Sequence, residues 1–94
     1  MEGIGEDRPA TIWVAVLYIS DRVGQKLIQK HRIDPDDARS AVLCREGLQF
    51  TWDADPDRGL RAIVETRISG RPTLVVLYPL GDDEWHLGSA YPNA

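Results

Sequence analysis

Residues 60–78 read LRAIVETRISGRPTLVVLY, and this stretch decides the fold. Over residues 60–68 apolar and polar side chains alternate, a period of two that is typical of a β-strand with one face in the core. The core face would carry Leu60, Ala62, Val64, Thr66 and Ile68, and the other face Arg61, Ile63, Glu65 and Arg67. Ser69-Gly70-Arg71-Pro72 then forms a tight connection into the apolar run 73–78. The stretch therefore predicts an antiparallel hairpin.

Further strands are predicted on both sides of this hairpin. Residues 48–52 alternate, and a turn-rich loop at 53–59 leads into the hairpin; a loop at 79–84 leads out of it to a last strand at 85–91. At the other end, residues 11–19 are rich in β-branched and aromatic residues and apolar on both faces, as in a strand covered on both sides. Short polar connections favour antiparallel pairing.

Two helices are predicted between the first strand and the others. Ser20 or Asp21 can cap a helix that runs to about His31, with Val23, Leu27, Ile28 and His31 along one face. Asp34 can cap a second helix with Pro35 at its first position, and Gly47 can end it. Residues 1–94 are thus expected to form one α+β domain in the order β-α-α-β-β-β-β, with two N-terminal helices packed on a mainly antiparallel sheet, after a flexible segment at residues 1–10.

Charge is distributed unevenly along the chain. Eleven Lys and Arg stand against fifteen Asp and Glu, a formal net charge of −4. Eight of the cations lie in two windows, which hold Arg22, Lys26, Lys30 and Arg32, then Arg58, Arg61, Arg67 and Arg71. The acids gather in separate turn-like clusters. An acidic chain of this kind can carry a local basic site for a phosphate-bearing partner.

Cysteine content and hydropathy indicate the compartment. Cys44 is alone, so no intrachain disulfide is possible, and we expect it to be a small buried residue of the second helix in a reducing compartment. The apolar run 10–19 is far shorter than the roughly 20 residues of a membrane helix, and it follows acids rather than a basic leader. We predict a cytoplasmic protein with no membrane partner.

Two groups of residues are candidates for chemistry. On the polar face of strand 60–68, Arg61 and Arg67 could hold a phosphate, while Glu65 could act as a base or orient a hydroxyl. The alternative is a solvated face with a cross-strand ion pair.

In the first helix, Lys26, Lys30 and Arg32 flank His31, a residue suited to proton transfer. The alternative is a helix end whose cations are stabilised by the negative pole of the helix dipole. Tyr91 could transfer a proton or stack on a base, or be an ordinary residue at a strand end. Neither histidine has a metal-ligand spacing.

Read in order, these motifs resemble a known family. Lys-x₃-Lys-His-x-Ile at 26–33 runs into Asp-Pro-Asp-Asp-Ala at 34–38. A strand with Arg61 and Glu65 precedes Gly70-Arg71 and Thr-Leu-Val-Val-Leu at 73–77, and Gly-Ser-Ala-Tyr-Pro occupies 88–92. From about residue 12 to residue 91 this is similar to the BrnT-type branch of the RelE superfamily, the toxin halves of bacterial type II toxin–antitoxin pairs. Where BrnT-like proteins usually have Ser-Ala-Arg, this chain has Tyr91 as its third residue, and it lacks their Trp-Asp start.

The resemblance implies a RelE-like fold and a metal-independent endoribonuclease that arrests growth until a cognate antitoxin masks it. It implies no cofactor, RNA as substrate (on the ribosome or free), and higher-order assembly only with the antitoxin. Mapped by motif, the catalytic candidates are His31, Arg61, Glu65, Arg67 and Tyr91, and the phosphate-binding candidates are Lys26, Lys30, Arg32, Arg58 and Arg71. The alternative is a catalytically weak RelE-fold protein that serves as a binding module, with a partner helix or strand docked on its sheet.

Overall fold

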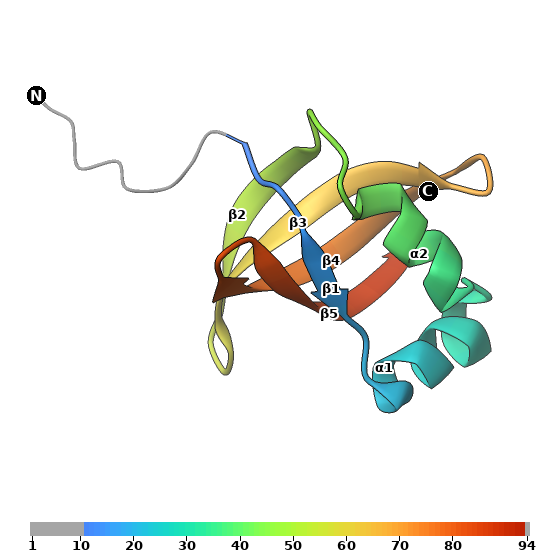
Figure 1. Ribbon diagram of the computed structural model, residues 1–94. Coiled ribbons are helices and arrows are strands. Elements are labelled where there is room, and N and C mark those ends of the chain that lie inside the picture. The colour runs from blue at the N-terminus through green and yellow to red at the C-terminus, as the bar shows by residue number, and fades with distance from the viewer. Residues whose placement is uncertain (1–10, 94) are drawn as a thin grey trace, which may run out of the picture.

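In the computed structural model, which describes residues 11–93, five strands form a sheet in the order β1-β5-β4-β3-β2 (Figure 1). The strands are β1 (Val16–Tyr18), β2 (Gln49–Asp55), β3 (Gly59–Ile68), β4 (Arg71–Gly81) and β5 (Glu84–Pro92). All neighbours pair antiparallel except β1 and β5, which pair parallel. Together with two helices, this confirms the predicted α+β class and a mainly antiparallel sheet.

The β3–β4 hairpin is built as its alternation predicts. Its register runs from Ala62 opposite Leu77 to Ile68 opposite Arg71, and Ser69 and Gly70 make the turn with positive φ angles of 54° and 75°. The buried side chains belong to the predicted core face, since Ala62, Val64 and Ile68 are all buried. The opposite face, with Arg61 and Glu65, is called the outer face below.

The helices lie together on one side of the curved sheet (Figure 1). Helix α1 (Asp21–Lys26) is capped by Ser20, whose Oγ accepts a hydrogen bond from the Val23 N–H, and it continues as a π-helical turn, η1 (Leu27–His31). Helix α2 (Pro35–Val42) is capped by Asp34, whose carboxylate accepts from the Asp36 N–H. Both predicted caps are confirmed. No helix in residues 11–93 has the length and apolar content needed to span a membrane.

The first strand is shorter than predicted, because residues 11–15 are not part of the ladder. Ile12 and Val14 are buried in the core, and the Val14 carbonyl accepts a hydrogen bond from the Cys44 N–H. The prediction that the segment is covered on both sides is also wrong, since Trp13, Val16 and Tyr18 are exposed. The predicted flexible segment, residues 1–10, lies outside the described residues.

Two details of the second helix were predicted wrongly, and one residue of the first helix differs in exposure from its neighbour. Helix α2 ends at Val42 rather than near Gly47, because Leu43 is extended and Cys44 has a φ of 53°. Cys44 is consequently exposed and outside the helix. Ile28 is 55% exposed, whereas Leu27, which was predicted to lie on the same helical face, is buried.

Two predicted loops are tighter than expected. Strand β2 extends to Asp55, and only residues 56–58 connect it to β3. Strand β4 extends to Gly81, and Asp82 and Asp83, both with positive φ, connect it to β5. Two successive positive φ angles are the mark of a type I′ hairpin turn, which Asp tolerates well.

Candidate functional site

The sheet edge formed by the second half of β5 brings two predicted catalytic residues together. Strand β1 pairs only with residues 84–86 of β5, and η1 packs against β5. His31, the last residue of η1, thereby reaches Tyr91, with the ring centroids 6.3 Å apart and the ring planes at 47°. Both side chains are partly exposed. An imidazole and a phenol at this separation can act on one substrate.

A hollow beside this pair is lined by cations. Lys26, Lys30 and His31 line it from the helix side, and Gly88 and Ser89 from β5. Both lysine side chains are exposed, whereas Leu27 between them is buried and anchors the segment in the core. Two ammonium groups beside a proton-transfer residue suit a phosphate whose charge increases during reaction.

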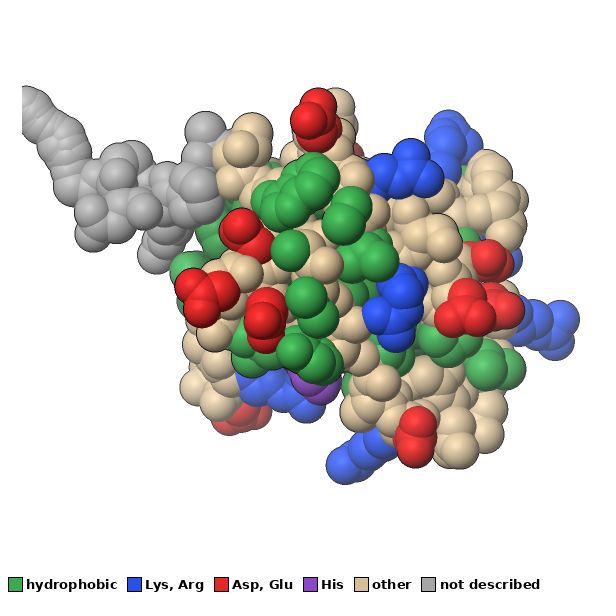
Figure 2. All heavy atoms as spheres, in the orientation of Figure 1, with side chains coloured by type: hydrophobic (Ala, Val, Ile, Leu, Met, Phe, Trp, Pro, Cys, Tyr) green, Lys and Arg blue, Asp and Glu red, His purple; other side chains and the backbone are tan. Residues whose placement is uncertain are grey.

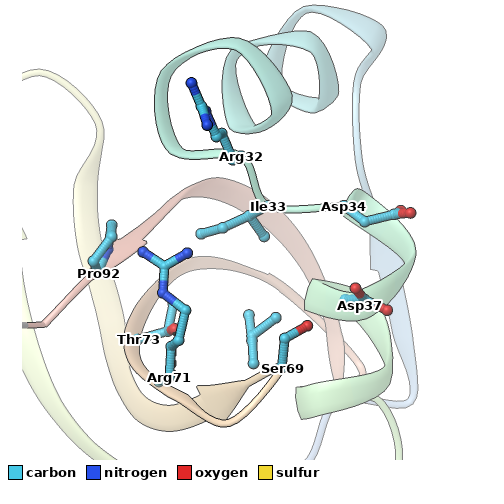
Figure 3. A pocket seen from close by; sticks show the side chains of 9 residues that line it. Arg32, Ile33, Asp34, Asp37, Ser69, Arg71, Thr73 and Pro92 are labelled. Atoms are coloured by element: carbon cyan, nitrogen blue, oxygen red, sulfur yellow. Dashed lines mark hydrogen bonds between the residues drawn. The ribbon is translucent and has the colours of Figure 1, made fainter.

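A second, smaller hollow lies where the helices meet the β3–β4 turn. It encloses about 30 Å³, and its lining includes Arg32, Asp37, Ser69, Arg71 and Pro92. In Figure 3 the Arg71 guanidinium points between Ile33 and Pro92, while the Arg32 side chain extends away along its helix. Thus Arg32 and Arg71 lie at the same end of the molecule as His31. The hollow is too small for more than about one or two water molecules.

The other end of β3 holds a network around Arg61. Its Nε donates to the Asp53 carboxylate at 2.8 Å, and its Nη1 lies 3.2 Å from the Asp55 carboxylate and 3.3 Å from the Tyr78 hydroxyl. Tyr78 in turn donates to Asp55 at 2.9 Å. Bonds to Tyr78 and Asp53 raise the pKa of Arg61, and backbone N–H donation from Asp57, then the Tyr78 bond, lower the pKa of Asp55.

Two further contacts complete this network. The Arg58 guanidinium lies over the Tyr78 ring, 5.2 Å from its centroid. Beneath the ring is Gly88, where an added Cβ would come within 2.4 Å of Tyr78 Cε2. Arg58 and Arg61 are therefore held by groups of the protein itself, and Arg61 lies about 20 Å along β3 from Arg67.

Glu65 and Arg67 occupy the outer face between the two ends. Glu65 is exposed and shares a row with Leu74 and Tyr91, so two strand spacings, about 10 Å, separate its Cα from that of Tyr91. Arg67 donates from Nη1 to the Gly70 carbonyl at 2.9 Å. Glu65 is thus on the same face as Tyr91 but not in contact with it.

The structure adds residues that the sequence analysis did not select. Ser89 joins the hollow beside His31, and it stood in the quoted Gly-Ser-Ala-Tyr-Pro motif. Asp53, Asp55 and Tyr78 hold Arg61; the two acids were assigned to a loop, which hid their position opposite the arginine. A strand prediction extended from residue 52 to residue 55 would have placed the two acids, Asp53 and Asp55, opposite the arginine.

Within residues 11–93, no group of three or more His, Cys, Asp or Glu side chains could hold a metal ion.

Comparisons of the chain with protein-family models, with curated proteins and with solved structures give no match. Function is therefore argued below from the residues of this chain and their arrangement.

Proposed function

We propose that this chain is the toxin component of a bacterial type II toxin–antitoxin pair, a RelE-like, BrnT-type endoribonuclease that works in the cytoplasm without a metal. The observation that carries the proposal is the contact of His31 with Tyr91 beside the hollow lined by Lys26 and Lys30. The motif order from Lys26 to Tyr91 supports it. A cognate antitoxin would neutralise the activity by covering this end of the sheet.

The proposed reaction is an internal transesterification of RNA. His31 removes the proton of a ribose 2′-hydroxyl, and that oxygen forms a bond to the adjacent phosphorus. The bond from phosphorus to the 5′-oxygen breaks, and this oxygen takes a proton from Tyr91, leaving a 2′,3′-cyclic phosphate. Lys26 and Lys30 stabilise the charge that accumulates on the phosphate oxygens. Glu65 is the alternative base, on the same face about 10 Å across the sheet.

The distribution of charge favours this end for RNA. Two of the acidic clusters lie elsewhere, since Asp53 and Asp55 are at the Arg61 end and Asp82 and Asp83 form the β4–β5 turn, eight residues or about 27 Å along β5 from Tyr91. The third cluster, Asp34, Asp36 and Asp37, is at the start of α2, and Figure 2 accordingly shows both Lys or Arg and acidic side chains over the helical side of the face in view. A chain with a net charge of −4 can therefore still offer a cationic surface to RNA.

The test is inducible expression in bacteria of the wild type and of the double variant His31→Ala, Tyr91→Phe. The matched control is His86→Ala, Tyr18→Phe, the same two changes at the register pair Tyr18–His86 near the other end of β5. We expect growth arrest and RNA fragments with 2′,3′-cyclic phosphate ends for the wild type and the control, but not for the His31–Tyr91 variant. A folded wild type that leaves growth and RNA intact would refute the proposal.

The second candidate is a protein-binding module with little or no catalysis. It is favoured by the exposure of apolar side chains of β1 and β4: Val16 (37%), Tyr18 (46%) and Leu80 (56%). It is also favoured by Arg61, whose guanidinium is engaged by Asp53 and Asp55. If the wild type is harmless at soluble levels equal to those of its variants, this candidate takes precedence.

A further inference from the structure

Strand β2 is a long and unprotected edge of the sheet. It is the last strand in the sheet order, and its seven residues, Gln49–Asp55, pair with β3 on one side only. Proteins usually protect such edges with lysine, proline or a bulge. Strand β2 contains no lysine and no proline, its register against β3 has no shift, and its two charged residues, Asp53 and Asp55, are bonded to Arg61 of their own chain. No strand within residues 11–93 pairs with its outward backbone groups, which can therefore accept another strand.

Two aromatic side chains of this edge, Phe50 and Trp52, are partly buried and pack against the core. Trp52 stacks on Trp85 at a centroid distance of 6.2 Å. Phe50 contacts Trp52 edge-to-face at a centroid distance of 5.4 Å. The indole Nε1 of Trp52 is buried without a hydrogen-bond partner in the part of the chain that the structure describes. Beside it, Trp52, Asp53, Ala54 and Leu60 line a hollow that is open at the surface. Aromatic area thus reaches the edge itself.

We propose that β2 pairs antiparallel with β2 of a second copy of this chain, about a two-fold axis at Trp52. Trp52 is the central residue, so this register is the one that pairs all seven residues in an isologous contact. It places Thr51 opposite Asp53, Gln49 opposite Asp55 and Phe50 opposite Ala54 of the second copy. No acid then faces an acid, and Asp53 and Asp55 are already bonded to Arg61 within their own chain.

Other registers are less favourable. Pairing about Asp53 would put the two copies of that acid opposite each other, and pairing about Ala54 would put Asp53 opposite Asp55 twice. Like charges in directly opposed positions destabilise a sheet. The register that pairs all seven residues of β2 is therefore also the one without opposed acids. For this reason we assign a second copy of the chain as the partner of this edge.

The dimer would be a continuous ten-stranded sheet, twice the five strands of one chain. Because β2 and β5 lie on opposite sides of β3 and β4, the His31–Tyr91 end would remain open at both outer flanks. The inference is independent of the proposed nuclease function, and it differs from the expectation that the chain assembles only with an antitoxin.

The experiment is the molar mass of the full chain alone, measured by light scattering during gel filtration and by sedimentation equilibrium over a range of concentrations. One chain has a mass of 10.5 kDa. We expect the wild type to reach twice that mass. Thr51→Asp puts a second acid opposite Asp53 twice per dimer and should weaken the dimer about tenfold. Thr51→Lys should preserve or strengthen it. Gln25→Asp, the same charge change on an exposed helix residue, is the control and should have no effect.

Two results would overturn the proposal. One is a wild type that is monomeric at every concentration, which would leave the edge to a strand of a different protein. The other is an equal response of the dimer to Thr51→Asp and Thr51→Lys, because charge pairing across β2 predicts opposite signs. Circular dichroism of each variant verifies that a monomer is a folded one.

Discussion

Cations are in different states at the beginning of strand β3 and at the opposite end of the sheet, where η1 meets β5. At the beginning of the strand, Arg61 is bonded to Asp53, Asp55 and Tyr78, and both ion pairs found in residues 11–93 belong to it. At the far end, where η1 and β5 meet, Lys26 and Lys30 line a hollow beside His31 and form no ion pair in residues 11–93. Figure 1 shows these ends at opposite sides of the sheet.

This difference indicates which cations are available to a ligand. An arginine opposite acids in the next strand has its hydrogen-bond donors occupied, and using it for RNA would require breaking those bonds. A lysine on an exposed turn has no such competitor. The charge of a cation does not by itself show whether it is available to a ligand; what decides this is the side chain that the neighbouring strand or helix places opposite it.

The sharpest way to test the comparison is to remove one hydroxyl at each end. Tyr91→Phe should reduce RNA cleavage about 100-fold, because it removes the proposed proton donor. Tyr78→Phe should leave cleavage within a few fold, since its hydroxyl contacts only the Arg61 network. Initial rates on a single-stranded RNA measure both. Equal losses in the two variants would contradict the separation of the ends.

Gly88 links the two ends, because it lies under the Tyr78 ring and also lines the hollow beside His31. Gly88→Ala should lower the free energy of unfolding by about 1–3 kcal/mol, since its Cβ would overlap a ring whose hydroxyl is fixed by two partners. Gly24→Ala, whose Cβ would meet Pro35 Cγ at an ordinary 3.4 Å inside a helix, is the control and should be neutral or slightly stabilising. Urea unfolding followed by tryptophan fluorescence measures both. A neutral Gly88→Ala would mean that Tyr78 is not held in place.

The same two tyrosine variants should show the reverse order in stability. Tyr78→Phe leaves Asp55 and Arg61 without their shared partner and should cost about 1 kcal/mol. Tyr91→Phe should be neutral, because the Tyr91 hydroxyl has no hydrogen-bond partner among residues 11–93. Thermal and urea unfolding provide the measurement. A destabilised Tyr91→Phe would reveal a structural role at the end assigned to RNA.

The smallest expected effect is a change in acid stability. The pKa of Asp55 is lowered in the folded protein by the Asp57 N–H, then by the Tyr78 hydroxyl. The contribution of Asp55 to the free energy of unfolding is therefore complete at pH values above its ordinary pKa of 3.8. This contribution is lost as the pH falls from 3.8 through the lower pKa that Asp55 has in the folded protein. Asp55→Asn should flatten this loss, while Asp36→Asn, at the other end of the molecule, serves for comparison. Unfolding free energies between about pH 5 and pH 2 measure the difference; parallel curves would contradict it.

Local patterns predicted much of the fold. The alternation in β3, the turn at Ser69 and Gly70 and the caps at Ser20 and Asp34 all depend on neighbouring residues, and each is confirmed. The segment 11–15 was wrongly predicted as strand because Ile12 and Val14 are buried in the core without being part of the sheet. The π turn at Leu27–His31 has no local signature that would distinguish it from an α-helix.

The candidate site was predictable in its members but not in its arrangement. His31 and Tyr91 were selected separately, and only the packing of η1 on the open edge of β5 brings them together. The pairing of Arg61 with Asp53 required knowing that β2 extends to Asp55. Both facts concern which elements become neighbours, and that is decided by tertiary packing.

The position of β5 in the sheet has a consequence during synthesis of the chain. Strand β5 lies between β1 and β4, so the earliest strand can join the sheet only after residues 84–86 have been made. The contact between His31 and Tyr91 likewise waits for the last strand. Pairings between residues so distant in sequence form late. A nascent chain that stops before Glu84 would hold the helices and the β2–β4 meander without the paired rings, so the nuclease activity that we propose would be absent until the final strand is in place.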